Sequence, residues 1–356
     1  MKSLWMKNFL AVFPVPKYLS LGSVSCAVDY DTFRFIEFRR YGKNLSVTTS
    51  GMSFLPSPVD KTLKPAEDVR KFIGNVLSRA KKNNVSLVIP EQSVYVFTVE
   101  IPFVEPKLIR EAISFKLEQY VPIAAAEALF EYDVVATDSV RETLTVAVRV
   151  VPRSQVESLV SLVSSETVLV TECETESTCL SRAVSQKDGD VHLIVHIGRA
   201  STVFVVTKDG IPFFSSTLAV GSVDISSAVA KVFSVPLSQV SKIRSNLRGS
   251  TVPDKKLLDA LIPTLSSIRD EMDKVVEYWN THLDSNVTTK IKSIFLSGQD
   301  VVFPSIMTYL ELSAVVPITI ADVWRNVTTA KNALPPIELE SALGFAPTIG
   351  AALRTH

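Results

Sequence analysis

The sequence predicts a mixed α/β fold with two lobes, and three observations lead to that prediction. Short β-branched runs alternate with amphipathic helical stretches over most of the 356 residues. One central stretch, Val191–Val223, holds three strand-like runs and then opens a helix. A separate β-α-β-β-α pattern interrupts the alternation between residues 85 and 164. We expect this pattern to form a compact knob that stands off the first lobe.

The central stretch is the part of the chain around which the other elements are organised. It begins with the β-branched run Val191–Ile197, which ends at Gly198, and continues with a second run, Thr202–Thr207. Residues 208–210 are a hairpin turn signal, and the third run leads through Gly221 into a helix. Backbone N–H groups at such turns and helix starts can hold a phosphate. An ordinary β-meander with surface turns fits the same residues, because lone glycines are weak motifs.

The other predicted elements follow from hydrophobic periodicity and from turn signals. In chain order they are two strands within 24–38 joined at 29–31, strand 45–50, helix 67–82, strands 85–89 and 94–101, helix 105–120, strands 130–136 and 144–151, helix 154–164, strand 168–172, helices 176–185, 224–233, 238–247 and 254–283, strand 291–296, helix 304–312, strand 315–320 and helix 342–353. Within helix 254–283, apolar residues from Leu261 to Trp279 step by three and four and predict a narrow buried seam.

Composition and charge exclude several classes of protein. Hydrophobic residues make up 46% of the chain, which is enough for a large core. The 37 basic and 37 acidic residues cancel, and this balance argues against a nucleic-acid-binding protein. Three widely spaced cysteines, Cys26, Cys173 and Cys179, favour a reducing compartment over a disulfide framework. The four histidines show no metal-ligand spacing.

The N-terminal residues decide the expected localisation. No run of 18 apolar residues occurs, so we expect no transmembrane helix. The apolar run 9–13 resembles a signal peptide only faintly, because Pro14 and Pro16 interrupt it and no cleavage site follows. We therefore expect a cytoplasmic protein with residues 1–16 as a tail. A short amphipathic segment that contacts a membrane or a partner stays open as an alternative.

Several segments, in this order, resemble the PilM family, the actin-like cytoplasmic proteins of type IV pilus assembly. They are Val24–Phe38, Ile101–Ile123, Val191–Asp224 with 231–233 and 238–244, Ile291–Tyr309 and Ala342–Leu353. The chain is also similar to FtsA, a division protein with the same kind of inserted subdomain. The resemblance implies an actin/hexokinase-like fold, in which two lobes enclose a cleft. It covers nearly the whole chain after about residue 20.

The resemblance also implies a division of the chain into five parts. These are an N-terminal tail at 1–16; a first lobe from 17–84, 165–189 and 341–356; an inserted subdomain at 85–164; a second-lobe core from 190–232 and 291–340; and a helical part of the second lobe at 233–290.

The implied nucleotide cleft departs from that of actin-like ATPases. The residues implied to line it are Asp29, Arg34, Gly198, Ser201, Thr202, Gly221 and Gly298. Ala27 and His196 stand where the family's magnesium-holding aspartates belong, and Ser222 and Gln299 replace glycines. Alanine and neutral histidine are poor ligands for magnesium. A shifted register, in which Asp29 or Asp31 takes over, is the alternative. We expect no catalytic residues, no metal and no required cofactor, with ATP or ADP bound weakly at most.

The function implied by the resemblance is that of a scaffold rather than an enzyme. PilM-like proteins bind the cytoplasmic N-terminal tail of the membrane protein PilN in a groove between the first lobe and the insert. The residues implied to lie in or near this groove are Pro102, Phe103, Ile109, Ile113, Tyr120 and Pro122, unless they form the insert's own core. Other expected partners are further pilus assembly proteins and a second copy of the chain, but no nucleic acid. The protein would lie at the inner face of the cytoplasmic membrane through its partners.

Two other functions are compatible with the same fold. One is an active actin-like ATPase of the pilus machinery, whose cleft cycles between states. The other is an FtsA-like division filament, which would carry a C-terminal amphipathic membrane helix. We expect no such helix after Leu353, and this favours the scaffold.

Overall fold

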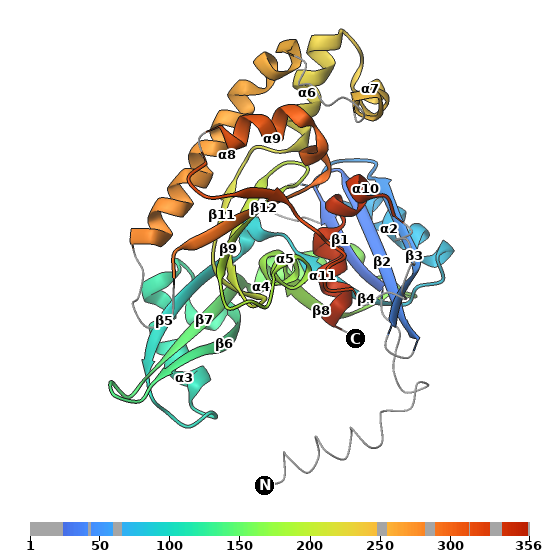
Figure 1. Cartoon of the computed structure of the whole chain (residues 1–356). Coiled ribbons are helices and arrows are strands. Elements are labelled where there is room, and N and C mark those ends of the chain that lie inside the picture. Colours follow the sequence, from blue (N-terminus) through green and yellow to red (C-terminus); the bar gives the residue numbers. More distant parts are fainter. Residues whose placement is uncertain are drawn as a thin grey trace.

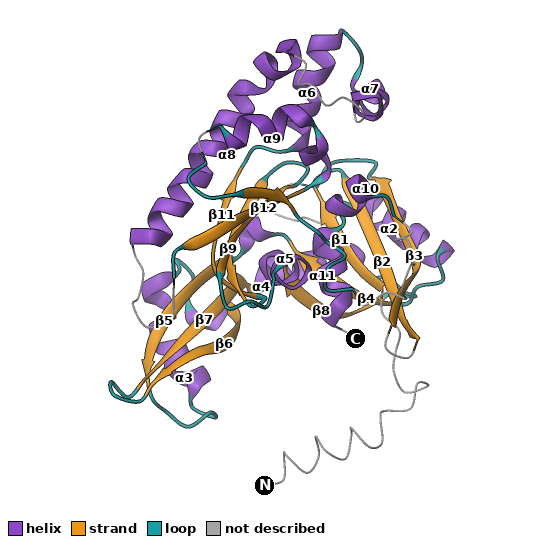
Figure 2. Cartoon of the chain, viewed as in Figure 1, coloured by secondary structure: helices purple, strands orange, loops and turns teal. Residues whose placement is uncertain are grey.

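The chain folds into two lobes and an insert, each built on its own β-sheet (Figures 1 and 2). The computed structural model describes residues 24–41, 44–59, 66–247, 255–281, 289–312, 314–327 and 337–354. The tail predicted at 1–16 lies outside these ranges. No helix in the described ranges is both long enough and apolar enough to cross a membrane.

The first lobe contains a five-stranded sheet in the order β3-β2-β1-β4-β8. Its strands are β1 (Val24–Asp29), β2 (Thr32–Tyr41), β3 (Asn44–Phe54), β4 (Asn84–Ile89) and β8 (Leu169–Thr175). The helices α2 (Glu67–Arg79) and α4 (Arg153–Val163) share one hydrophobic core with this sheet. Strands β1, β4 and β8 run parallel, so their C-terminal ends meet at one edge, where a site can form.

The second lobe contains a five-stranded sheet in the order β11-β10-β9-β12-β13. Its strands are β9 (Val191–Ile197), β10 (Thr202–Lys208), β11 (Ile211–Leu218), β12 (Ile291–Ser297) and β13 (Ile318–Ile320). Its helices are α6 (Ser222–Phe233), α7 (Val240–Leu247), α8 (Lys255–Thr281) and α9 (Pro304–Glu311). The central stretch therefore forms strands and a helix as predicted. The predicted seam of α8 is confirmed, because Leu261, Leu265, Ile268, Met272, Val275 and Trp279 are all buried.

Two helices, α5 (Glu176–Val184) and α11 (Ala346–Arg354), lie between the sheets of the two lobes (Figure 1). They pack so closely that a Cβ on Gly350 would lie 1.8 Å from the carbonyl oxygen of Cys179. The predicted helix 342–353 is divided into α10 (Leu339–Gly344) and α11. The break falls at Phe345, and Pro347 lies in the first turn of α11, where a proline is tolerated because its missing N–H would have no partner within the helix.

The insert is a three-stranded sheet in the order β5-β7-β6, covered by one helix. Its elements are β5 (Tyr95–Pro102), α3 (Ile109–Tyr120), β6 (Ala128–Asp138) and β7 (Thr143–Pro152). Apolar residues of α3 and of the sheet form a separate core. The insert stands off the first lobe at the lower left of Figure 1.

The predicted insert boundaries, 85 and 164, are wrong at both ends. Strand β4 belongs to the first lobe, because Val85 pairs with Val24 of β1. Helix α4 also belongs there, since Leu159 and Leu162 are buried in the same core as α2. The insert sheet therefore runs from β5 to β7 and has a β-α-β-β pattern without the final helix.

Candidate functional site

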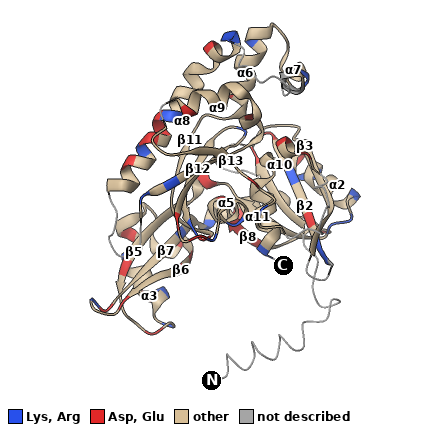
Figure 3. Cartoon of the chain, in the orientation of Figure 1, with Lys and Arg blue, Asp and Glu red and all other residues tan. Residues whose placement is uncertain are grey.

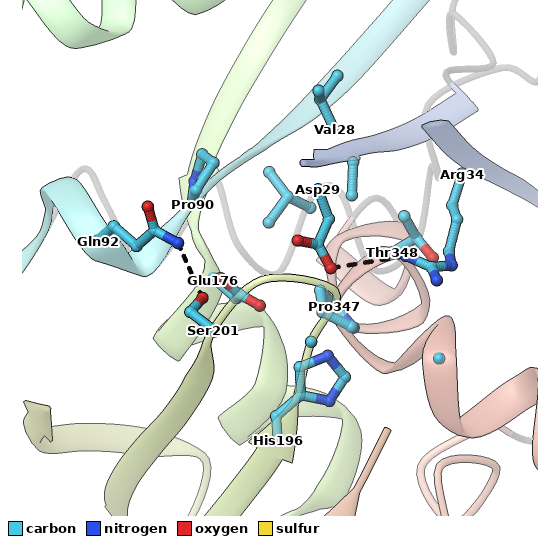
Figure 4. A pocket seen from close by; sticks show the side chains of 14 residues that line it. Val28, Asp29, Arg34, Pro90, Gln92, Glu176, His196, Ser201, Pro347 and Thr348 are labelled. Carbon is cyan, nitrogen blue, oxygen red and sulfur yellow. Dashed lines mark hydrogen bonds and ion pairs between the residues drawn. The ribbon is translucent and has the colours of Figure 1, made fainter. Parts of the chain in front are cut away.

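The turns of the two lobes meet at a small cavity of about 30 Å³ (Figure 4). It is lined by Ala27, Val28, Asp29, Arg34, Val88, Pro90, Gln92, Glu176, His196, Gly198, Ser201, Gly344, Pro347 and Thr348. The structure thus brings together four of the residues predicted for the cleft, namely Asp29, Arg34, Gly198 and Ser201. Thr202 points away and donates to the carbonyl of Val220 at 2.8 Å.

The carboxyl group of Asp29 lies across the cleft against the second lobe. One of its oxygens accepts a hydrogen bond of 2.8 Å from the backbone N–H of Arg199 and lies 3.8 Å from Arg34 Nη1. Burial raises the pKa of the Asp29 carboxyl, while Arg34 and the Arg199 N–H act in the opposite direction. Backbone N–H groups and arginine side chains are the groups that commonly bind phosphate. Here the Arg199 N–H and Arg34 instead contact the carboxylate of Asp29.

A bidentate ion pair joins the same two turns. Arg199 Nε lies 2.7 Å from one oxygen of Asp31, and Arg199 Nη2 lies 2.6 Å from the other. Arg199 follows β9 in the second lobe, whereas Asp31 lies in the β1–β2 turn of the first. Paired arginine–carboxylate contacts of this kind fix geometry as well as adding energy. Both aspartates that a shifted register would offer to magnesium are thus engaged by arginine.

Further backbone donors around the second turn already have partners within the protein. The N–H groups of Ser222 and Val223 donate to the carbonyls of Gly198 and Arg199, both at 2.9 Å. The N–H of Gly221 donates to the carboxylate of Asp224 at 2.8 Å. The start of α6 therefore points its donors at the turn rather than into an open phosphate site.

The glycines predicted for phosphate contact serve close packing of these turns. A Cβ on Gly221 would lie 2.6 Å from the carbonyl oxygen of Arg199. Gly298 has φ of +110°, and a Cβ there would lie 2.3 Å from the carbonyl oxygen of Ile197. Gly221 and Gly298 are not among the residues that line the cavity. Their lack of a side chain lets neighbouring loops approach one another.

The two positions of the missing aspartates hold no magnesium ligand. Ala27 has no polar side-chain atom, and the ring of His196 is buried with Nδ1 3.2 Å from Ser297 Oγ. Burial, together with the nearby Arg34, lowers the pKa of His196 to about 3, so the ring is neutral at physiological pH. No cluster of metal-ligand residues occurs in the described ranges. The residues present therefore do not fit a magnesium–nucleotide complex.

Three polar residues of this cleft were missed by sequence reasoning. Gln92 donates to Ser201 Oγ at 2.8 Å, and the buried carboxylate of Glu91 accepts from the backbone N–H of Ser177 at 2.8 Å. Glu176, the first residue of α5, accepts from the backbone N–H of Glu91 at 3.1 Å. Their positions in the sequence do not indicate a site, because polar side chains are common both in loops and at the first residue of a helix.

Burial and the nearby negative charge of Asp29 raise the pKa of Glu176 from 4.5 to about 8. The unfolded chain ionises this carboxyl near pH 4.5. The folded state therefore loses stability as pH rises from about 4.5 to 8, and the loss is complete above pH 8. We expect the melting temperature of Glu176→Gln to equal that of the parent near pH 5. Near pH 9 we expect it to be several degrees higher than that of the parent.

Thermal melting across this pH range, with exposed Glu277→Gln as the control, checks the expectation for Glu176. Equal melting temperatures of parent and Glu176→Gln at both pH values would show that Glu176 ionises normally in the folded protein.

A larger cavity, of about 240 Å³, lies between the first lobe and the insert. We call it the insert groove. Its lining residues are Ile89, Arg110, Leu129, Phe130, Glu131, Arg149, Val151, Val156, Cys173, Glu174 and Thr175. Strand β8 is an edge strand of the first-lobe sheet, and β6 is an edge strand of the insert sheet. An edge strand therefore borders the groove on each side. No described strand pairs with these two edges.

Charged side chains surround the apolar part of the insert groove. Arg110 lies over the ring of Phe130, 4.3 Å from its centre. Arg149 pairs with Asp133 at 2.7 Å. Glu174 is buried and accepts from Arg182 through both oxygens, each at 2.7 Å. The groove therefore combines apolar walls with fixed charges of both signs.

Comparison with known proteins identifies the family. A family model described as type IV pilus assembly protein PilM matches residues 28–356. The chain belongs to the PilM family. In the solved structure of a PilM–PilN type IV pilus biogenesis complex, the matching chain is 17% identical, with a TM-score of 0.75 and coverage of 94% of this chain and 99% of that one.

A second solved structure supports the fold assignment. The ethanolamine utilization protein EutJ from Carboxydothermus hydrogenoformans is 12% identical, with a TM-score of 0.50 and coverage of 98% and 97% of the two chains. The predicted actin-like, two-lobed fold is confirmed by these likenesses. No curated protein sequence matches the chain.

The residues that the PilM resemblance implied for partner binding fall into two groups. Ile109 and Ile113 are buried in the insert's own core and offer no surface to a partner. Pro102, Phe103, Tyr120 and Pro122 are exposed, and Tyr120 stacks on Phe97 with ring centres 4.6 Å apart. None of the six lines the insert groove. The groove residues that sequence reasoning missed lie on β4, β6, β7, β8 and α4 and at Arg110 of α3.

Proposed function

We propose that this PilM-family protein is an adaptor of type IV pilus assembly. It binds the cytoplasmic N-terminal tail of a PilN-like membrane protein and is thereby held at the inner face of the membrane. The observation that carries the proposal is the insert groove, with its volume of about 240 Å³ and its two unpaired edge strands. The likeness to the PilM chain of a PilM–PilN complex supports a partner of this kind.

The shape of the groove suits an extended peptide. An edge strand presents backbone N–H and C=O groups that a further strand can pair with. Strands β6 and β8 offer such groups on the two sides of the groove. A tail that enters in extended form can pair with one edge and place alternate side chains on the apolar walls.

The chemistry of the groove sets the kind of side chains that fit. Leu129, Val151 and Val156 supply apolar surface. Arg110 and Glu131, at its exposed side, supply charges of both signs. A tail with aliphatic residues and at least one charged group would therefore bury its apolar side chains and keep its charge paired.

The interlobe cleft acts in this proposal as a fixed joint rather than a catalytic site. Its cavity of about 30 Å³ has room for about one or two water molecules, whereas small-molecule sites occupy about 300–1,000 Å³. Arg199 holds Asp31 and its backbone holds Asp29, so the two lobes are joined without a nucleotide. We therefore expect the tail to bind without ATP and the protein to hydrolyse none.

Isothermal titration calorimetry with a synthetic peptide of the PilN-like tail tests the proposal. We expect a 1:1 complex with a Kd on the order of micromolar, unchanged by ATP and magnesium. ATP–magnesium alone should give no binding heat. Tail binding that requires ATP, or micromolar ATP binding accompanied by turnover, would favour the active ATPase instead.

A further inference from the structure

Two covalent connections join the insert to the first lobe, and one of them is held by buried carboxyl groups. It consists of residues 90–94 between β4 and β5, which include the 3₁₀ turn Glu91–Ser93. We call residues 90–94 the linker turn. The other connection has no intervening residue, because β7 ends at Pro152 and α4 begins at Arg153. A swing of the insert about the β7–α4 junction would therefore have to move the linker turn.

Reciprocal hydrogen bonds hold the linker turn to the start of α5. The backbone N–H of Glu91 donates to the carboxyl of Glu176 at 3.1 Å, and the carboxyl of Glu91 accepts from the backbone N–H of Ser177 at 2.8 Å. We call these two bonds the carboxyl clamp. Glu91 is only 1% exposed, so the bond to its carboxyl is shielded from water and is costly to break. Gln92 also ties the linker turn to Ser201 of the second lobe, at 2.8 Å (Figure 4).

The two segments that the carboxyl clamp joins continue directly from residues of the insert groove. Ile89 lines the groove, ends β4 and is followed by the linker turn. Thr175 also lines it, ends β8 and is the N-cap of α5. Burial raises the pKa of the Glu91 carboxyl, and one of the groups that act in the opposite direction is Arg149, which lines the groove from β7. The clamp is therefore adjacent to both walls of the groove.

We propose that Glu91 and Glu176 are positioning residues for the binding of the tail. Their bonds fix the linker turn, and with it the angle between the insert and the first lobe at which the insert groove forms. Neither residue lines the groove, so both act through its walls and not by contact with the tail. This inference rests on the proposed function and extends it, because Glu176 lines the interlobe cavity and thus connects that cavity with the groove.

The charge on Glu176 decides how firmly the carboxyl clamp holds. Apart from each other, the titratable and charged groups that face the two clamp carboxyls are Asp29 of β1, Arg34 of β2, Arg149 of β7, Cys179 of α5 and His196 of β9. Burial, together with the negative charge of Asp29, raises the pKa of Glu176 to about 8. Near pH 7 this carboxyl is therefore mostly neutral. As the pH rises past 8 it ionises, and repulsion from Asp29 and Glu91 weakens its hold on the linker turn.

Titration calorimetry with the synthetic tail peptide near pH 7 tests the carboxyl clamp. Glu91→Ala removes the acceptor for Ser177 and should raise the Kd about tenfold, because the groove is then formed in only a fraction of the molecules. Glu91→Gln keeps an oxygen acceptor and should bring the Kd back to within about threefold of the parent value. The matched control is Glu277→Ala, since Glu277 is exposed and lines neither cavity. Figure 3 shows acidic and basic residues along its helix, α8, and we expect this control to bind like the parent.

The pH dependence of tail binding separates positioning from a merely structural role. Between about pH 6.5 and about pH 9, we expect the Kd of the parent to rise about three- to tenfold as Glu176 ionises. Glu176→Gln stays neutral and still offers an acceptor to the Glu91 N–H, so its Kd should change much less. Ionisation of the peptide itself affects both proteins equally and cancels in the comparison.

The alkylation rate of Cys173 in the free protein reports on the groove without any peptide. Cys173 lines the groove, whereas the clamp residues do not. We expect Glu91→Ala to raise the rate near pH 7 about threefold or more, because the insert then moves away from the first lobe more often. Glu91→Gln and Glu277→Ala should alkylate like the parent.

Parent-like Kd and alkylation rate in Glu91→Ala, or parallel pH profiles of the parent and Glu176→Gln, would overturn the positioning role. If Glu91→Ala does not fold, the comparison of the parent with Glu176→Gln decides the question alone. A peptide that fails to bind even the parent would overturn the adaptor proposal instead. Faster alkylation of Cys173 in Glu91→Ala would in that case still show that the carboxyl clamp holds the groove.

Discussion

Replacing Gly350 by alanine is expected to destabilise the fold by at least about 3 kcal/mol. The added methyl carbon would lie 1.8 Å from the carbonyl oxygen of Cys179, and the atom it meets is backbone rather than a movable side chain. Helices α5 and α11 would have to separate. Arg182, which donates to the carbonyl of Gly350 at 2.8 Å and pairs with Glu174 beside the insert groove, would be displaced with them.

Urea unfolding followed by circular dichroism measures the effect of Gly350→Ala. The matched control is Gly74→Ala in α2, where an added Cβ meets no atom within 4 Å. We expect that control to be neutral or to stabilise by about 0.5–1 kcal/mol, since alanine favours a helix over glycine. A Gly350→Ala variant as stable as the parent would show that α5 and α11 separate at little cost.

Filling the insert groove is expected to weaken tail binding by about a hundredfold, roughly 2.7 kcal/mol. Leu129→Arg places a long charged side chain at the apolar wall supplied by β6, where an aliphatic residue of the tail is expected to sit. Leu129 is only partly buried, so the exchange should leave the fold intact.

Titration of the tail peptide into Leu129→Arg checks the location of the partner site. Val140→Arg adds the same side chain at the β6–β7 turn, where the valine is 94% exposed and outside the groove. We expect this control to bind the peptide like the parent. Undiminished binding by Leu129→Arg would place the partner elsewhere, for example on the exposed Phe103 and Phe115 of the insert.

Elements with strong local periodicity could be predicted from the sequence. The seam of α8 and the central strands follow from residue spacing alone, because burial on one face repeats with the period of the element. The boundary of the insert does not follow in this way. The runs that become β4 and β5 both read as short apolar strands, and only the pairing of β4 with β1 assigns it to the first lobe.

The candidate site was predictable in outline but not in its contacts. The PilM resemblance implied that Asp29, Arg34, Gly198 and Ser201 share one cleft, and the structure brings them together. The contact of Arg199 with Asp31 joins residues 168 positions apart in the sequence, so no local sequence pattern predicts it. The groove between the first lobe and the insert was expected from the resemblance, but the residues that line it were missed for the same reason, since its walls include strands β6 and β8, which belong to different sheets.

The adaptor account depends most directly on a tail that occupies the insert groove. Cys173 provides a native probe, because its thiol lines that groove while Cys26 and Cys179 are buried elsewhere. Burial raises the pKa of Cys173 to about 11, so alkylation near pH 8 is slow enough to follow by mass spectrometry.

Alkylation of Cys173 should therefore be measured with the tail peptide, with ATP–magnesium and with neither. The account predicts that saturating peptide slows the modification of Cys173 about tenfold or more, that ATP–magnesium has no effect, and that Cys26 and Cys179 stay unmodified throughout. An unchanged rate with bound peptide, or protection by ATP–magnesium alone, would contradict the account.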